Sequence, residues 1–160
     1  MADSKLSICL WCDGTAEEQA RFYGSLLPDG RVEAVNRSAV STPGGVGPGD
    51  VLTAVVALGG QKILLLNGGP MFKPSEAASL MIETDDQAET DRLWDAIVDG
   101  GGQESACGWC KDRWGVSWQI TPRRLLHLTT DPDANRARRA MKAMMTMRRI
   151  DIAAVERAAA

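Results

Sequence analysis

Two cysteine pairs with the same spacing are the first residues whose types suggest chemistry. Cys9 and Cys12, and again Cys107 and Cys110, form C-x-x-C sequences, a spacing typical of zinc sites and thiol redox motifs. The first pair lies in the apolar run Lys5–Cys12, which predicts a strand, and side chains three positions apart on a strand point to opposite faces. One ion could then bind both thiols only at a bulge or turn. We expect the cysteines to act as small buried hydrophobic residues, with a four-cysteine zinc site as the less favoured alternative.

Other metal or cofactor signals are weak. The sole histidine, His127, follows the last predicted strand and is expected at the surface or at an interface. The glycine cluster Gly44–Gly49 precedes the strand-like run Val51–Leu58 rather than a helix, so it lacks the context of a cofactor-binding glycine loop. We predict no metal and no bound cofactor.

Tryptophans and a few polar residues on predicted strands or their edges favour a pocket for a small hydrophobic or aromatic molecule. Trp114 and Asp112 belong to this group of tryptophans and polar residues. The alternative is that the tryptophans fill the core. The predicted ligand-binding residues are Trp11, Asn67, Trp109, Lys111, Trp118 and Gln119.

An internal repeat positions these residues. Shifted by about 71 residues, Ser4–Asp29 aligns with Ser75–Gly100. Thr15 with Glu18, and Asp86 with Glu89, have the spacing of a helix-starting capping box. Both copies predict a strand followed by a helix.

Three further strands follow each helix, so the sequence predicts an α+β fold of two tandem βαβββ modules that form a curved mixed sheet enclosing a cleft. The modules span residues 4–67 and 75–122 of a domain comprising residues 1–130. Pro122 is expected to end the sheet, and a helical extension of two helices is predicted over residues 131–160, the first at Pro132–Met147.

Bulk composition excludes several classes of partner. A formal charge of −3 gives no reason to expect nucleic acid. No apolar run approaches the roughly 20 residues that span a bilayer, and no signal-peptide core follows the N-terminus. We expect a cytoplasmic protein.

Four segments resemble the PhnB-like branch of the vicinal oxygen chelate superfamily, which includes glyoxalase I, extradiol dioxygenases and bleomycin-resistance proteins. They are CLWCDGTAEEQARFY (9–23), LLLNGGPMFK (64–73), CGWCKDRWGVSWQITPRRL (107–125) and MKAMMTMRRIDIAAVERA (141–158). The branch carries the name 3-demethylubiquinone-9 3-methyltransferase.

The resemblance implies where a metal would bind: at one position on the first and one on the last strand of each module. The matching positions are Ile8, Leu65 or Leu66, Ser79 and Gln119. Only Gln119 is a plausible ligand, and one amide does not hold a transition metal. A metal-free ligand-binding protein or enzyme is therefore the first hypothesis, a non-enzymatic sequestering protein the second and methyl transfer the third.

The resemblance also implies a homodimer. Ile150, Ile152, Val155 and the methionines of the preceding helix lie outside both modules. Such apolar stripes meet a second chain or pack back on their own.

Overall fold

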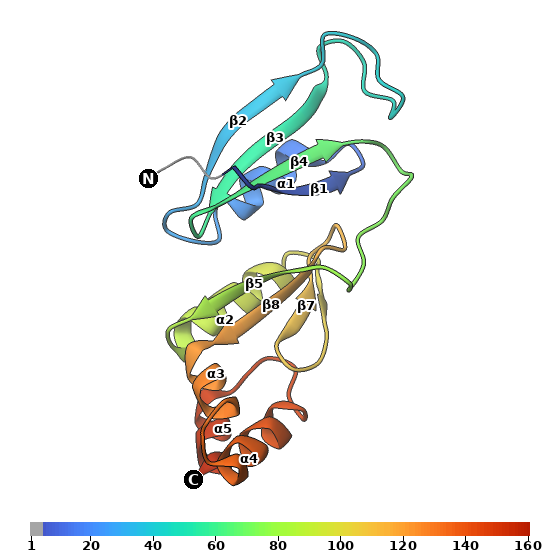
Figure 1. The fold of residues 1–160 in the computed structure, drawn as a ribbon. Helices are drawn as coiled ribbons and strands as arrows, with labels where there is room; N and C mark the ends of the chain where they lie inside the picture. Colours follow the sequence, from blue (N-terminus) through green and yellow to red (C-terminus); the bar gives the residue numbers. More distant parts are fainter. Residues whose placement is uncertain (1–4) are drawn as a thin grey trace. The chain divides into compact units, whose positions relative to one another are not determined.

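The computed structural model describes residues 5–160, and the chain divides between Lys73 and Pro74 into two compact units (Figure 1). Each unit contains one four-stranded mixed sheet, and the second also contains the C-terminal helices. The α+β class is thereby confirmed.

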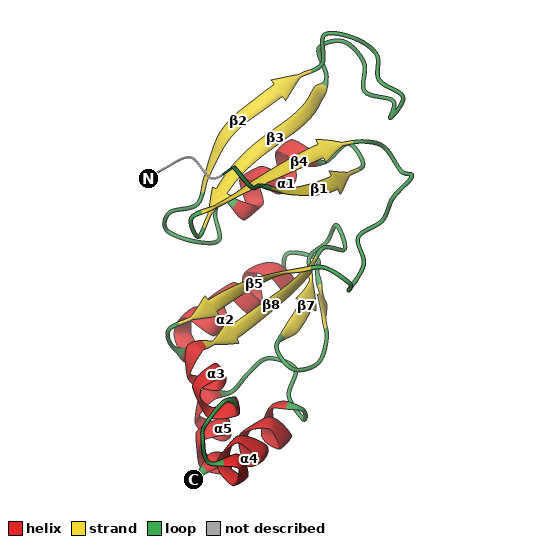
Figure 2. Ribbon diagram, in the orientation of Figure 1, coloured by secondary structure: helices red, strands yellow, loops and turns green. Residues whose placement is uncertain are grey.

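The first unit is a complete βαβββ module. Its strand order is β1-β4-β3-β2, in which β1 runs parallel to β4 and the other pairs are antiparallel. Figure 2 shows helix α1 against the sheet of this unit. The elements are β1 (Ile8–Cys12), α1 (Ala16–Tyr23), β2 (Arg31–Arg37), β3 (Val51–Leu58) and β4 (Gln61–Asn67).

The second unit repeats this topology. Its strand order is β5-β8-β7-β6, and β5 is parallel to β8 as β1 is to β4. The predicted duplication is therefore confirmed. The elements are β5 (Ser79–Thr84), α2 (Gln87–Val98), β6 (Gln103–Glu104), β7 (Trp109–Lys111) and β8 (Ser117–Pro122).

Three helices follow the second sheet, where the sequence predicts two. They are α3 (Arg123–Thr129), α4 (Ala134–Met144) and α5 (Ile152–Ala159). The unpredicted helix α3 starts directly after Pro122, so the prediction that this proline ends the sheet is correct. Seven residues are too few for a clear helical period.

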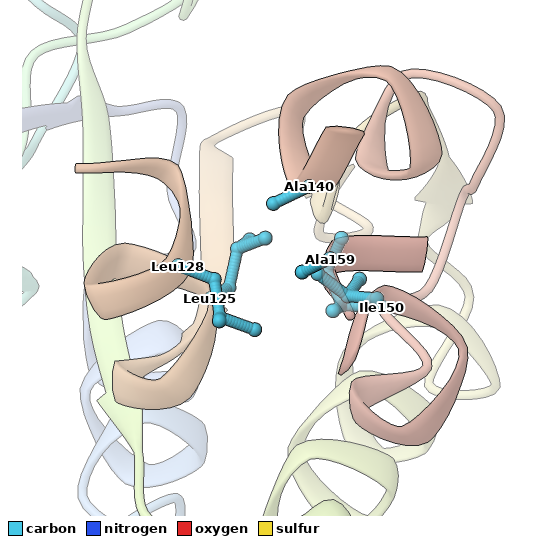
Figure 3. Close-up of a cluster of buried hydrophobic side chains, with 6 residues drawn as sticks. Leu125, Leu128, Ala140, Ile150 and Ala159 are labelled. Atoms are coloured by element: carbon cyan, nitrogen blue, oxygen red, sulfur yellow. The ribbon is translucent and has the colours of Figure 1, made fainter. Parts of the chain in front are cut away.

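The C-terminal helices pack around a small apolar cluster of their own (Figure 3). Ile150 and Val155 are almost completely buried within this one chain. For these two residues, packing back on their own chain has occurred. The cluster consists of Leu125, Leu128, Ala140, Ile150, Val155 and Ala159.

The two predicted capping boxes differ in outcome. Asp86 caps α2 as expected, because its carboxylate accepts a hydrogen bond from the Glu89 amide at 2.8 Å. Thr15 directly precedes α1 as predicted, but the prediction that its side chain caps the helix is wrong: its hydroxyl accepts a bond from the Gln19 side chain at 2.7 Å. The amide of Ala16, at the start of α1, donates to the Asn67 side chain at 3.0 Å. A residue 51 positions away thus supplies the cap.

Candidate functional site

Each sheet has one face covered by the helix of its own unit and one face on the opposite side. Along β4, Ile63, Leu65 and Asn67 are buried, whereas Leu64 and Leu66 are half-buried. Asn67 bonds to the start of α1, so Leu64 and Leu66 lie on the face away from α1. We call the faces away from α1 and α2 the open faces.

The open face of the first sheet is apolar. Trp11 pairs with Leu66, and Cys9 with Leu64, which in turn pairs with Val55. These side chains form one continuous surface because paired residues point to the same side of a sheet.

Trp11 lies at one end of that surface. Its indole N–H donates a hydrogen bond to the carbonyl of Gly69 at 2.7 Å. Its ring meets Phe72 edge to face, with ring centroids 4.9 Å apart. Phe72 itself is more than half exposed. Two aromatic rings with exposed area can therefore stack against a flat ligand.

The open face of the second sheet carries polar groups beside apolar ones. Met81, Gln119 and Trp109 form one row across three strands. The Gln119 amide donates to the hydroxyl of Ser79 at 2.9 Å. Thr84 lies on the α2 side, because it shares a hydrogen bond with Thr90 of that helix. Met81 is three residues before Thr84 on the same strand and so points to the opposite face, and Gln119 shares the row of Met81. Gln119 therefore lies on the face opposite α2.

A second row on this face consists of Ser79, Ser117 and Lys111. Ser117 is buried, and within residues 5–160 its hydroxyl has no hydrogen-bond partner. Lys111 forms an ion pair with Glu76, and the hydrogen bond from Lys111 lowers the pKa of that carboxyl. Hydroxyl, amide and ammonium groups thus lie beside Trp109 and Met81.

Two of the predicted ligand-binding residues have structural roles instead. Trp118 is completely buried on the α2 side of its strand, and its indole N–H donates to Asp112 at 2.9 Å. Asn67 is also buried, and its amide nitrogen donates to the Val51 carbonyl at 2.9 Å while its oxygen caps α1. Neither side chain lies on an open face.

Asp112 organises the turn between β7 and β8. One carboxylate oxygen accepts hydrogen bonds from the amides of Trp114 and Val116, both at 3.0 Å, and the other accepts the bond from Trp118. Asp112 is buried. The tryptophan-rich segment after Cys110 is therefore a folding motif, which its composition alone does not reveal.

The side chains at the positions implied for a metal do not fit one. Ser79 and Gln119 are adjacent, but they offer a hydroxyl and an amide. In the first unit, Leu65 is buried on the α1 side, and Ile8 pairs with Ile63 on that side. Leu66, on the open face, offers no donor atom. None of these positions supplies the imidazole, carboxylate or thiolate ligands that such ions prefer.

The cysteines do not converge either. Cys9 is exposed whereas Cys12 is buried, as the alternation along a strand predicts. Cys107 has a positive φ of 60° and is half-buried, and Cys110 is buried on the α2 side opposite Trp118. The expectation of burial thus fails for Cys9. In the described part of the chain, no three His, Cys, Asp or Glu side chains are grouped to hold a metal. His127 is exposed.

Thiol reactivity should follow this arrangement. Burial, with the nearby Asp112 charge, raises the pKa of Cys110 to about 12, so almost no thiolate is present near neutral pH. We expect iodoacetamide to modify Cys9 at least about tenfold faster than Cys110, because Cys9 is accessible. Peptide mass spectrometry over time measures both rates, with the urea-unfolded protein as the control. Equal rates in the folded protein would contradict the buried position of Cys110.

Residues 4–121 match the family described as 3-demethylubiquinone-9 3-methyltransferase. No curated protein matches the chain. The match ends before α3, so the C-terminal helices lie outside it, although their sequence also resembles the branch.

Solved structures show the same fold. The PhnB protein of Bacillus cereus is 27% identical with a TM-score of 0.66, and the alignment covers 74% of this chain and 99% of that one. A Pseudomonas aeruginosa protein is 21% identical with a TM-score of 0.61, and the alignment covers 75% of this chain and 98% of that one. The fosfomycin resistance protein FosX of Mesorhizobium loti is 12% identical with a TM-score of 0.52, and the alignment covers 76% of this chain and 92% of that one.

None of the helices within residues 5–160 is long and apolar enough to cross a membrane. Two βαβββ modules, the match over residues 4–121 and the similarity to PhnB point to one assignment. The chain belongs to the 3-demethylubiquinone-9 3-methyltransferase family, in the PhnB-like branch of the vicinal oxygen chelate superfamily.

Proposed function

We propose that this protein binds a small hydrophobic or aromatic molecule on the open faces of its sheets and uses no metal ion. The observation that carries the proposal is the row of Trp109, Gln119 and Met81 beside the buried hydroxyl of Ser117. A buried hydroxyl without a partner is costly, by about 1–3 kcal/mol. A ligand oxygen removes that cost when the side chains that cover the hydroxyl move aside and let it bond.

The ligand chemistry follows from the surrounding groups. Trp109 offers an aromatic surface, and Ser79, Ser117 and Lys111 offer O–H and N–H donors. A planar molecule with a carbonyl or phenolic oxygen, such as a quinone or phenol, suits this combination. In the first unit, Trp11 and the leucines beside it offer apolar area alone.

Calorimetry with a set of quinones and phenols tests this proposal. For a compound that binds, we expect Trp109→Ala and Gln119→Leu each to weaken affinity about tenfold or more, because stacking and a hydrogen bond are lost. Trp94→Phe is the matched control, because Trp94 is buried in α2. Binding that neither open-face substitution alters would contradict the proposed site.

Methyl transfer is the alternative that the family name suggests, and sequestration without turnover is another. The glycine-rich loop before β3 leads into a strand, so this chain offers no helix N-terminus there for a cofactor. Calorimetry with S-adenosylmethionine separates the alternatives. Specific affinity for it would favour methyl transfer, whereas binding of a phenol or quinone without any conversion would favour sequestration.

We also propose that the chain is a homodimer. Ile150 and Val155 no longer support this, since they are buried within one chain. The support that remains is on α4 and the turn after it, where Met141 and Met145 are 41% and 64% exposed. Large exposed apolar side chains close together favour a protein contact.

A further inference from the structure

The C-terminal helices differ sharply in charge from the rest of the chain. Residues 123–160 contain nine Lys or Arg and four Asp or Glu, a net charge of +5. Residues 1–122 contain nine Lys or Arg and 17 Asp or Glu, a net charge of −8. The family match ends at residue 121, so the basic segment lies outside the matched residues.

Helix α4 presents the cations together with exposed methionines. Arg138, Met141, Lys142 and Met145 are exposed and recur at a spacing of three or four residues, so they share one face. The opposite side of α4, including Ala140, packs in the helical cluster. α4 contains no Asp or Glu. Its outer face is therefore cationic and partly apolar.

The same unit contains an acidic groove of about 980 Å³ between α2 and residues 148–156. Arg124, Arg148 and Arg149 line it, and Arg149 pairs with Asp91 and Asp95 at 3.3 and 3.0 Å. The eight acidic groups outnumber these three arginines, and Arg123 also pairs with one of them, Asp85, so the net charge is −4. They are Asp85, Asp86, Asp91, Asp95, Asp99, Glu104, Asp151 and Glu156.

Apolar side chains also line this groove. Val98 and Ile152 lie among the carboxylates and are half-buried. The groove thus combines the two properties that the outer face of α4 requires, negative charge and apolar contact for methionine. Methionine adapts well to an irregular apolar surface.

We propose that α4 of one copy binds the acidic groove of a second copy, and that this contact is reciprocal. The inference rests on the homodimer proposed above and gives it an interface. Charge complementarity favours a second copy as the occupant, because this chain carries both surfaces. Two such contacts per dimer bring Arg138 and Lys142 toward Asp95 and Asp99 of the other chain, with Met141 and Met145 toward Val98 and Ile152.

Charge reversal combined with a mass measurement tests the contact. Light scattering should give a mass of twice 17.2 kDa for the full chain. Raising NaCl from about 0.05 to about 0.5 M should weaken the dimer, because salt screens the attraction between the opposite charges. Arg138→Glu with Lys142→Glu should raise the dimer dissociation constant at least about tenfold. The control is Lys5→Glu with Lys73→Glu, which makes the same change of charge at exposed positions in the first unit. This variant should leave the dimer dissociation constant unchanged.

A mixing experiment guards against misfolded variants. Asp95→Lys with Asp99→Lys should also prevent self-association, whereas mixing this variant with the α4 variant should restore a dimer through opposite charges. No restoration, or a dimer that the α4 variant does not weaken, would overturn this interface while leaving the homodimer intact. A mass of 17.2 kDa for the unmodified chain at all concentrations would reject both the homodimer and the interface. Capture of an acidic protein or a lipid vesicle by α4 without self-association would overturn the choice of occupant.

Discussion

Asp112→Ala is expected to lower the free energy of unfolding by about 3–5 kcal/mol, because three donors lose one buried acceptor. The donors are the amides of Trp114 and Val116 and the indole N–H of Trp118. Trp118 is completely buried, so water cannot readily replace the lost carboxylate. Urea denaturation followed by circular dichroism measures the change.

Asp50→Ala is the matched control. The Asp50 carboxylate accepts a bond from the exposed amide of Gly47 at 3.1 Å, and its removal should cost less than about 1 kcal/mol. Trp118→Phe should give part of the Asp112→Ala effect, and the two changes together should cost less than their sum because they share one bond. Equal effects of the two alanine substitutions would contradict the central role assigned to Asp112.

Sequence periodicity was sufficient to predict the repeated module because both copies carry their signals locally. A strand, a helix start and a helix stripe all lie within about 30 residues in each copy, and neither unit's topology departs from βαβββ. The opposite orientations of Cys9 and Cys12 likewise follow from the strand alone.

The ligand-binding set was harder to predict because residue type does not specify the face of a strand. Trp109 and Trp118 lie on neighbouring strands but point to opposite faces. Trp109 pairs with Gln119 on the open face, whereas Trp118 pairs with Cys110 on the α2 side. A shift of one residue exchanges open and helix-covered faces. Periodicity also could not predict Asn67 as the cap of α1, because the partners are 51 residues apart.

The open faces of the two modules differ in the chemistry that they offer. The open face of the first sheet offers tryptophan and leucine, whereas that of the second offers Ser79, Ser117 and Gln119. The helix-covered faces instead consist of side chains that stabilise the module, such as Leu65 and Trp118. Under the proposed function, substitution of an exposed open-face side chain such as Met81 should change ligand choice at little cost in stability.

Gly68→Ala is the second change for which we expect a large effect. A Cβ atom at Gly68 would lie 2.1 Å from the ring of Trp11, far inside van der Waals contact. Trp11 is held there by its hydrogen bond to Gly69 and by its contact with Phe72. We therefore expect the ring to leave its position and the free energy of unfolding to fall by about 2–4 kcal/mol, as in overpacked cores.

A double-mutant cycle isolates the cause of that loss. In a Trp11→Ala background the ring is absent, so Gly68→Ala should cost less than about 1 kcal/mol. Gly47→Ala is the control, because its added Cβ would meet only the end of the Asp50 carboxylate, at 3.1 Å. If Gly68→Ala is as damaging without the Trp11 ring as with it, the clash is not the cause. A cycle that shows the expected rescue would establish that Gly68 is required for Trp11 to occupy the end of the apolar open face.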